Sequence, residues 1–163
     1  MLPLDEKSVR ASLVNASQRE RASLTLPTDF GARQWDSLGF LGWRDPKLPL
    51  LGYVVAELDG RPTGVMLRQV EGRLRSRAQC SWCEDVQLPN EVVFFNARRS
   101  GAAGRNGNTV SILVCSHFEC NANVRKLPPM AYVGFDTEAA RDSRIDALRD
   151  HVRRFVTDIR EGG

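Results

Sequence analysis

The sequence predicts an α+β protein in which antiparallel β-hairpins carry a four-cysteine metal site and a long helix ends the chain. Three patterns indicate this class. Apolar runs separated by turn residues fill the middle of the chain, apolar residues recur at helical spacing over residues 137–160, and all four cysteines fall in two close pairs. A length of 163 residues suits one domain, or two small ones that share a core.

The amino-terminal segment is expected to be helical and then irregular. A first helix over residues 5–15 has an acidic first turn and a modest apolar stripe. The stripe consists of Val9, Leu13 and Ala16. Ser17 followed by Glu20 matches a capping box, so a second helix is expected to begin there and to end before Pro27.

Residues 29–51 are rich in aromatic side chains, glycine and proline. This composition is typical of an irregular segment held in place by buried rings. The rings are those of Phe30, Trp35, Phe40 and Trp43. We expect them to lie in the core rather than to form a ligand site.

Strand patterns begin at Tyr53. Residues 53–58 and 63–68 flank Asp59-Gly60, a dipeptide that accepts the positive φ angles of a tight hairpin turn. Residues 92–95 and 110–114 predict two further strands. Between them, residues 100–108 are too rich in glycine for a regular element, and we expect a long hairpin tip there.

The last predicted element is an amphipathic helix over residues 137–160. Its apolar positions are Ile145, Leu148, Val152, Phe155, Val156 and Ile159. The chain therefore divides into a helical and aromatic segment (1–52), a β-rich zinc-finger region (53–135) and a carboxy-terminal helix (136–163). We expect the three to form one compact unit.

Charge is unevenly distributed along the chain. The net charge is +3, but residues 61–126 alone hold 10 Lys and Arg against 5 Asp and Glu. This excess indicates either a solvated arginine-rich surface or a docking face for RNA or an acidic protein. No apolar run approaches the roughly 18 residues of a membrane span, and no secretory signal is evident, so a cytoplasmic protein is expected.

The cysteines have the spacing of a zinc site. Cys80 and Cys83 are separated by two residues, Cys115 and Cys120 by four, and the pairs themselves by 31 residues. A turn with two cysteines, a hairpin and a short helix carrying the remaining ligands is the treble-clef arrangement, which holds one tetrahedral Zn²⁺. A redox pair would leave Cys115 and Cys120 unused, and disulfides need an oxidising compartment. Four thiolates complete the metal's shell, so His117 is expected at the surface or beside the site.

The sequence contains no convincing catalytic set, so we do not expect an enzyme. The glycine-rich loop lacks the Gly-Lys-Ser/Thr ending of a phosphate-binding loop, and His151, among charged residues, is expected to face solvent. Arginines at the hairpin tip suit docking to carboxylates or phosphates instead. They are Arg98, Arg99 and Arg105. Strand alternation places one of Phe94 and Phe95 in the core and leaves the other free to face outward.

Four features together resemble the FusB/FBP family of proteins that bind elongation factor G. They are the Cys80-x-x-Cys83 turn, the strand end Ala97-Arg98-Arg99, the glycine-rich loop at residues 101–108, and the second cysteine pair. Residues 41–46 also resemble shorter members of the family from high-GC Gram-positive bacteria. The similarity is strongest over residues 40–130.

The resemblance implies a treble-clef zinc finger that binds elongation factor G and promotes its release from the ribosome, as family members do when they rescue translation from fusidic acid. It implies one structural zinc on Cys80, Cys83, Cys115 and Cys120, and no small-molecule substrate or membrane. It also implies a partner-binding face. The residues expected on that face are Phe94, Arg98, Arg99, Arg105 and Phe118.

The amino-terminal part of the chain is short and rich in aromatic residues, whereas the resistance proteins have a fuller helical domain there. The resemblance therefore supports binding to elongation factor G more directly than it supports drug resistance. Two other hypotheses stay open on the residues alone. One is a zinc module that binds ribosomal RNA, with arginines on phosphates and an aromatic ring for stacking. The other is a structural zinc domain with an unrelated protein partner.

Overall fold

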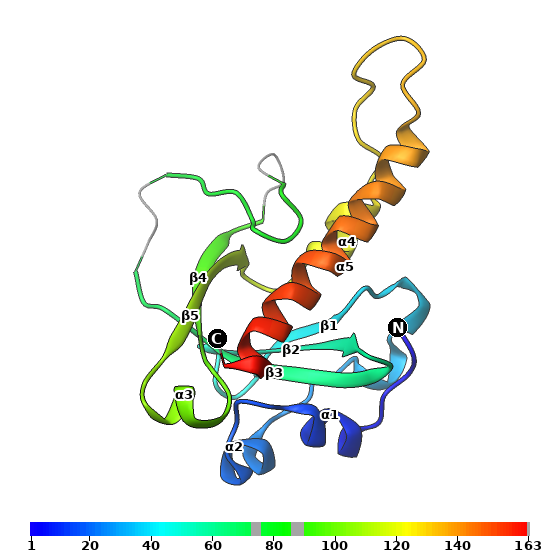
Figure 1. Ribbon diagram of the computed structural model, residues 1–163. Coiled ribbons are helices and arrows are strands. Elements are labelled where there is room, and N and C mark those ends of the chain that lie inside the picture. Colours follow the sequence, from blue (N-terminus) through cyan, green and yellow to red (C-terminus); the bar gives the residue numbers. More distant parts are fainter. Residues whose placement is uncertain (73–75, 86–89, 163) are drawn as a thin grey trace.

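The computed structural model describes residues 1–72, 76–85 and 90–162, which form one five-stranded antiparallel sheet flanked by helices (Figure 1). The strands lie side by side in chain order, so each pairs with its neighbour in sequence. They are β1 (Leu41–Arg44), β2 (Leu51–Leu58), β3 (Arg61–Gln69), β4 (Val92–Arg98) and β5 (Thr109–Cys115). The α+β class and the antiparallel hairpins predicted from the sequence are confirmed.

The helices lie at both ends of the chain and in its connections. They are α1 (Glu6–Ser12), α2 (Gln18–Ser23), α3 (Gly101–Arg105), α4 (Cys120–Arg125) and α5 (Thr137–Glu161), with short 3₁₀ turns η1 (Phe30–Ala32) and η2 (Trp35–Ser37). The predicted capping box starts α2: the Glu20 backbone N–H donates to Ser17 Oγ at 3.3 Å, and the Ser17 N–H donates to Glu20 Oε2 at 2.7 Å. Two orphan donors at the helix start are thereby satisfied.

Both faces of the central strands are buried. On β2, Val54 and Ala56 belong to a cluster that includes α5 and the cysteines, whereas Tyr53 and Val55 belong to a second cluster with α1 and the amino-terminal segment. Side chains alternate along a strand, so β2 contributes to each cluster in turn. The Asp59-Gly60 turn between β2 and β3 has the predicted positive φ angles, 53° and 71°.

The two hairpins of the sheet are joined by a short ladder. β3 and β4 pair through Arg68 with Asn96 and Gln69 with Phe95, and the Val70 N–H just beyond β3 donates to the Phe94 carbonyl at 2.9 Å. The predicted apolar stripe of α5 packs on β2 and β3. α5 and α4 extend beyond the sheet, and the loop that joins them, residues 126–136, projects furthest from the body (Figure 1). No helix among the described residues is long and apolar enough to cross a membrane.

The expectation that residues 29–51 are irregular is wrong at β1. Leu41–Arg44 pairs with β2, and Trp43 stacks on Tyr53 with ring centroids 5.0 Å apart. Phe40 and Trp43 are buried as expected, whereas Phe30 and Trp35 remain partly exposed. Four residues with a central glycine carry too little pattern to identify a strand, and β1 exists because β2 offers it an edge.

The expectation of a tip without regular structure at residues 100–108 is also wrong, because α3 lies within it. The helix begins at Gly101, which has a φ of 62°. Gly104 approaches its own loop closely: a Cβ there would lie 1.8 Å from the Arg99 carbonyl oxygen. Glycine thus permits this one compact turn although it disfavours longer helices.

Gly42→Ala is expected to lower the free energy of unfolding by about 1–3 kcal/mol, because β1 lies against the finger without room for a methyl group. A Cβ on Gly42 would lie 2.7 Å from both Phe118 Cβ and Phe40 Cε2. Gly31→Ala is the matched control, since no atom lies within 4 Å of its added Cβ. Chemical denaturation of both variants measures the difference, and equal stabilities would refute the close packing.

Candidate metal centre

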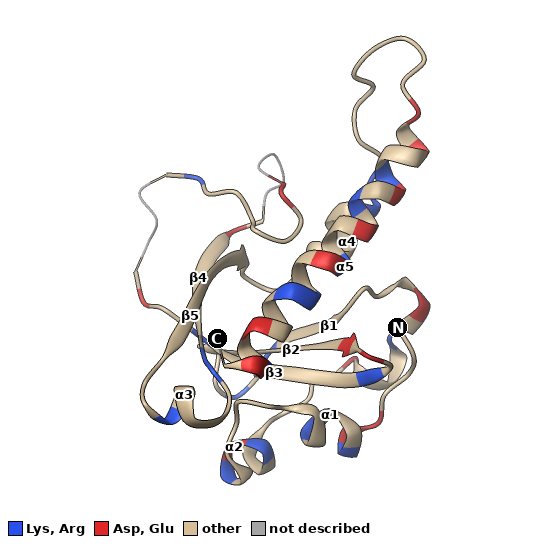
Figure 2. Cartoon of the chain, in the orientation of Figure 1, with Lys and Arg blue, Asp and Glu red and all other residues tan. Residues whose placement is uncertain are grey.

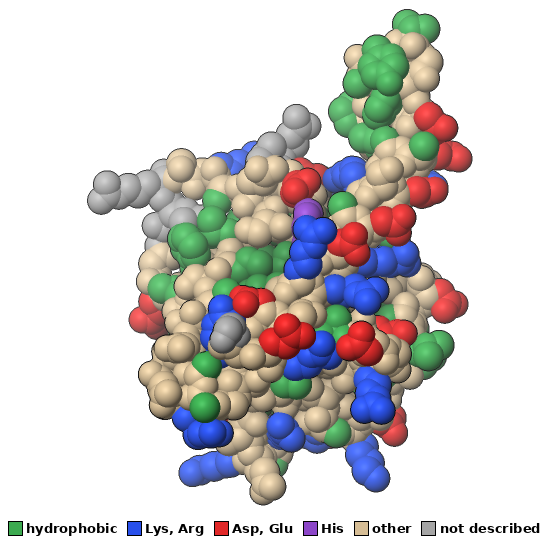
Figure 3. Space-filling view, viewed as in Figure 1, with side chains coloured by type: hydrophobic (Ala, Val, Ile, Leu, Met, Phe, Trp, Pro, Cys, Tyr) green, Lys and Arg blue, Asp and Glu red, His purple; other side chains and the backbone are tan. Residues whose placement is uncertain are grey.

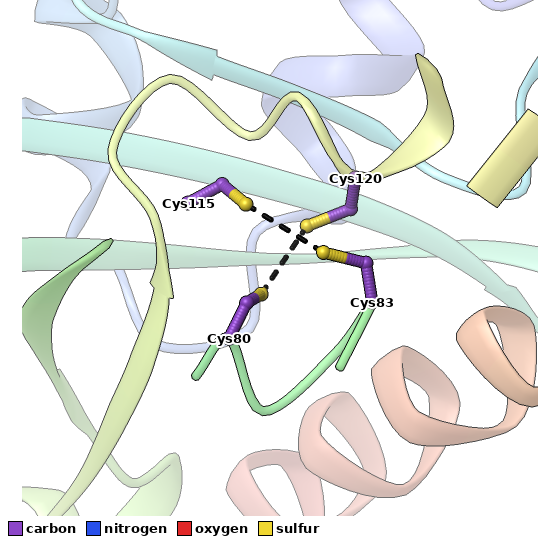
Figure 4. A group of neighbouring side chains, drawn as sticks. All are labelled: Cys80, Cys83, Cys115 and Cys120. Carbon is purple, nitrogen blue, oxygen red and sulfur yellow. Dashed lines mark hydrogen bonds between the residues drawn. The ribbon is translucent and has the colours of Figure 1, made fainter. Parts of the chain in front are cut away.

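The four cysteines come from three separate segments and meet at one point (Figure 4). Cys80 and Cys83 lie in the turn before β4, Cys115 ends β5, and Cys120 begins α4. All four side chains are buried, and their sulfur atoms lie within 4.8 Å of one another. The structure therefore joins the two cysteine pairs into one site, as the spacing predicts.

The geometry of the cluster fits Zn²⁺. Cys80 Sγ lies 3.6 Å from Cys120 Sγ, and Cys83 Sγ lies 3.7 Å from Cys115 Sγ. Four sulfurs bound tetrahedrally at about 2.3 Å from a zinc ion would lie ~3.8 Å apart. Disulfides, with sulfurs only ~2 Å apart, do not fit these distances, and all four cysteines are free. One structural zinc is held by Cys80, Cys83, Cys115 and Cys120.

Neighbouring N–H groups stabilise the sulfur atoms as thiolates. Asn123 Nδ2 donates to Cys115 Sγ at 3.5 Å and to Cys83 Sγ at 3.7 Å, and the Trp82 backbone N–H donates to Cys80 Sγ at 3.4 Å. Hydrogen bonding with Cys115 lowers the pKa of the Cys83 thiol to about 7. Hydrogen bonding with Cys115 raises the pKa of Cys120, and the pKa of Cys115 is raised as well, so a bound cation is needed to hold all four sulfurs as thiolates. Asn123 is a residue that the sequence analysis missed.

Backbone contacts shape the two cysteine turns. Ser81 N–H donates to the Leu113 carbonyl at 2.8 Å, which ties the first turn to β5. Phe118, between the second pair, has a φ of 59° in the left-handed region. This conformation costs a non-glycine residue of order 1 kcal/mol or more. Burial of its ring against Phe95, with centroids 5.2 Å apart, offsets that cost.

The metal turn is part of the main hydrophobic core. Trp82, between the first two cysteines, is buried, with its ring centroid 5.3 Å from that of Phe40 and 5.6 Å from that of Phe155 on α5. His151 on α5 places Nδ1 3.0 Å from the Trp82 carbonyl oxygen. His151 is expected from the sequence to face solvent, but its side chain is only partly exposed, because α5 presents the ring to the turn.

A site of this kind holds structure together. Four protein ligands fill a tetrahedral shell and leave no position for water or substrate. His117 is exposed, and its backbone N–H donates to Glu119 Oε2 at 3.0 Å. Among the described residues, the metal-binding cluster consists of the four cysteines and does not include His117.

The five residues expected at a partner surface occupy different environments. Phe94 is 40% exposed and Phe95 is buried, which settles the alternation between them. Arg105 is exposed, Arg98 forms an ion pair with Glu20 and Arg99 forms one with Asp158. Phe118 is only 4% exposed, so its expected place on an exposed face is wrong: its left-handed turn directs the ring into the core.

An exposed apolar tip, which the sequence analysis did not identify, ends the loop between α4 and α5. The tip comprises Leu127, Met130, Tyr132 and Val133, which are 56%, 71%, 66% and 98% exposed. Figure 3 shows hydrophobic side chains gathered at the end of this projection. The sequence signal that could have identified the tip is a pair of adjacent prolines, Pro128 and Pro129, among apolar residues that have neither helical nor strand spacing.

Comparison with known proteins gives one match. A family model described as the FBP C-terminal treble-clef zinc-finger matches residues 8–159, nearly the whole chain. No curated protein and no solved structure matches.

Cys120→Ala is expected to leave the finger unfolded or prone to aggregation, because metal binding and folding are coupled. Metal analysis should find less than one zinc per chain, and thermal unfolding should lose its cooperative transition. His117→Ala, a change at an exposed residue beside the ligands, should keep one zinc. A soluble Cys120→Ala protein that unfolds cooperatively without zinc would contradict this assignment.

Asn123→Ala removes both amide N–H bonds to sulfur and is expected to weaken zinc affinity by about 10- to 100-fold while one zinc still binds. Competition with a zinc chelator measures the change. Asn90→Ala is the control, because the Asn90 amide bonds to Glu119 rather than to sulfur. Equal chelator resistance in the two variants would show that the Asn123 bonds do not stabilise the thiolates.

Proposed function

Because the chain belongs to the FBP C-terminal treble-clef zinc-finger family, we propose that it binds elongation factor G and modulates the factor's interaction with, or release from, the ribosome. The protein acts by binding and not as an enzyme. The closed four-cysteine shell supports this proposal, since the zinc there has no position free for a substrate.

The observation that carries the proposal is the apolar tip. Soluble proteins rarely expose a contiguous apolar patch without an interaction to cover it, and aromatic and Met side chains are enriched in protein interfaces. The tip presents Met130, Tyr132 and Val133 together at the end of a projection. A protruding group of this kind fits a concave apolar groove on a folded protein.

The tip is held in a defined conformation. Pro128 and Pro129 restrict its first half, and the Phe135 N–H donates to the Tyr132 carbonyl at 3.1 Å. The rings of Tyr132 and Phe135 contact edge-to-face, with centroids 5.3 Å apart. Asp136 then caps α5 by accepting from the backbone N–H groups of Glu138 and Ala139. Such preorganisation lowers the entropy lost on binding.

Phe94 extends the proposed contact to the zinc-finger hairpin. Of the five residues expected at the partner surface, it is the apolar one whose side chain remains accessible. We assign the tip and Phe94 to the protein factor.

The effect on the ribosome follows from differential binding. A protein that binds the released or rearranged factor more tightly than the ribosome-bound factor shifts the equilibrium towards release. No chemical step is needed, and the size of the shift is set by the ratio of the two affinities.

The proposal is tested by equilibrium binding of the zinc-loaded protein to purified elongation factor G. We expect a one-to-one complex, and we expect Met130→Ser combined with Tyr132→Ser to weaken it at least ~10-fold, as loss of a central apolar anchor does. Zinc content and stability should not change, because both side chains are exposed.

Leu48→Ser is the matched control for this experiment, since Leu48 is an exposed apolar residue outside the tip. It should bind like the unaltered protein. No binding of the unaltered protein at ~100 μM, equivalent to only about 5 kcal/mol, would sink the proposed function.

A further inference from the structure

A basic pocket lies at the end of the molecule away from the tip. Its cavity, about 250 Å³ in volume, is lined by residues 14–17 and by the corner where β4 leads into α3. Figure 1 places α2 and α3 at the opposite end from the 126–136 loop, and Figure 2 shows basic residues on both helices. The arginines that line the pocket are Arg98, Arg99 and Arg105.

Carboxylates hold two of these arginines in place. Arg98 Nη2 donates to both carboxylate oxygens of Glu20 at 2.9 Å, and Arg99 Nη1 donates to Asp158 Oδ1 at 2.8 Å. The Arg98 side chain is nevertheless about half exposed. A guanidinium group has five N–H donors, so a group fixed in this way keeps donors for a ligand.

Positive charge exceeds negative charge at this corner. Arg105 on α3 lines the pocket, is exposed and has no ion-pair partner among the described residues. Counted with Arg98 and Arg99, it gives three guanidinium groups in the lining against the two carboxylates of Glu20 and Asp158. The surplus favours an anionic ligand.

We propose that this pocket binds phosphate groups of an RNA backbone. Guanidinium forks match the oxygens of a phosphate, and arginines already held by neighbouring carboxylates lose little freedom when they bind it. Arg105 lies on the exposed side of the pocket and contacts the phosphate from solvent.

The lining distinguishes RNA from an acidic protein. Its apolar members are small, namely Val14, Ala16 and glycines. The exposed large apolar side chains among the described residues, such as Phe94 and Tyr132, lie outside it. Protein interfaces rely on large apolar or aromatic anchors, whereas binding to a nucleic-acid backbone is largely electrostatic. The pocket, with arginines and without large apolar side chains, has the character of a site for a nucleic-acid backbone.

This inference does not depend on factor binding. It divides the surface into an apolar end for a protein and a basic end for RNA. A chain with both contacts is suited to a factor that works on the ribosome, where protein and RNA lie close together.

The test is fluorescence anisotropy of a labelled single-stranded RNA of about twelve nucleotides, titrated with the zinc-loaded protein at ~50 and ~200 mM salt. We expect a dissociation constant on the order of 10 μM at the lower salt, and a log–log salt slope of about −2, as three phosphate contacts on a single strand imply. Arg105→Ala should weaken binding about fivefold and make the slope shallower by ~0.7.

Arg154→Ala is the control, because it removes the same charge at an exposed position on α5 outside the pocket. It should leave binding nearly unchanged. Equal losses of RNA affinity in Arg105→Ala and Arg154→Ala would overturn the proposal that RNA binds in this pocket, because they would show only a general attraction between charges. Absence of binding at ~50 mM salt, or displacement of RNA by polyglutamate at equal charge concentration, would also overturn it, the latter in favour of an acidic protein.

Discussion

The cysteine cluster is the constraint on which the rest of the structure depends. It joins the turn that carries Cys80 and Cys83 to the end of β5 and the start of α4. Four bonds of about 2.3 Å to one ion leave these segments almost no relative freedom. Trp82, between two ligands, then carries the constraint to α5 through its contact with Phe155. Zinc therefore organises the core as well as the finger.

The finger and the sheet share that core rather than meeting at a separate interface. Phe118 lies between the second pair of cysteines and packs where β1 and β2 have glycines. A Cβ on Gly42 or Gly52 would lie 2.7 Å from atoms of its side chain. The sheet thus leaves room for the ring, and the left-handed backbone at Phe118 delivers the ring to that place. Metal binding and sheet packing are for this reason expected to form a single cooperative unit.

The use of the interior for metal and aromatic packing leaves interaction chemistry to the two ends of the molecule. The tip at residues 126–136 has apolar side chains in a restrained loop, and the corner between α2 and α3 has guanidinium groups. Apolar anchors mainly slow dissociation, whereas charges mainly speed association and respond to salt. Separate surfaces allow each contribution to change without the other.

Local rules explain what could be predicted from residues alone. The cysteine spacing, the Ser17 and Glu20 capping box, the Asp59-Gly60 turn and the stripe of α5 each act within a few residues or within one element, and the structure contains all of them. The zinc ligands, which are the centre of the candidate site, could be predicted from the sequence for the same reason.

Long-range packing decided the rest. β1 forms because β2 offers an edge, His151 contacts the metal turn because α5 lies over it, and Phe118 is buried because two distant glycines leave space for it. The exposure of Phe94 and the tip likewise depends on which surfaces other elements cover. Chemistry and local conformation are encoded in short stretches of sequence, whereas burial is a property of contacts between residues far apart in the chain.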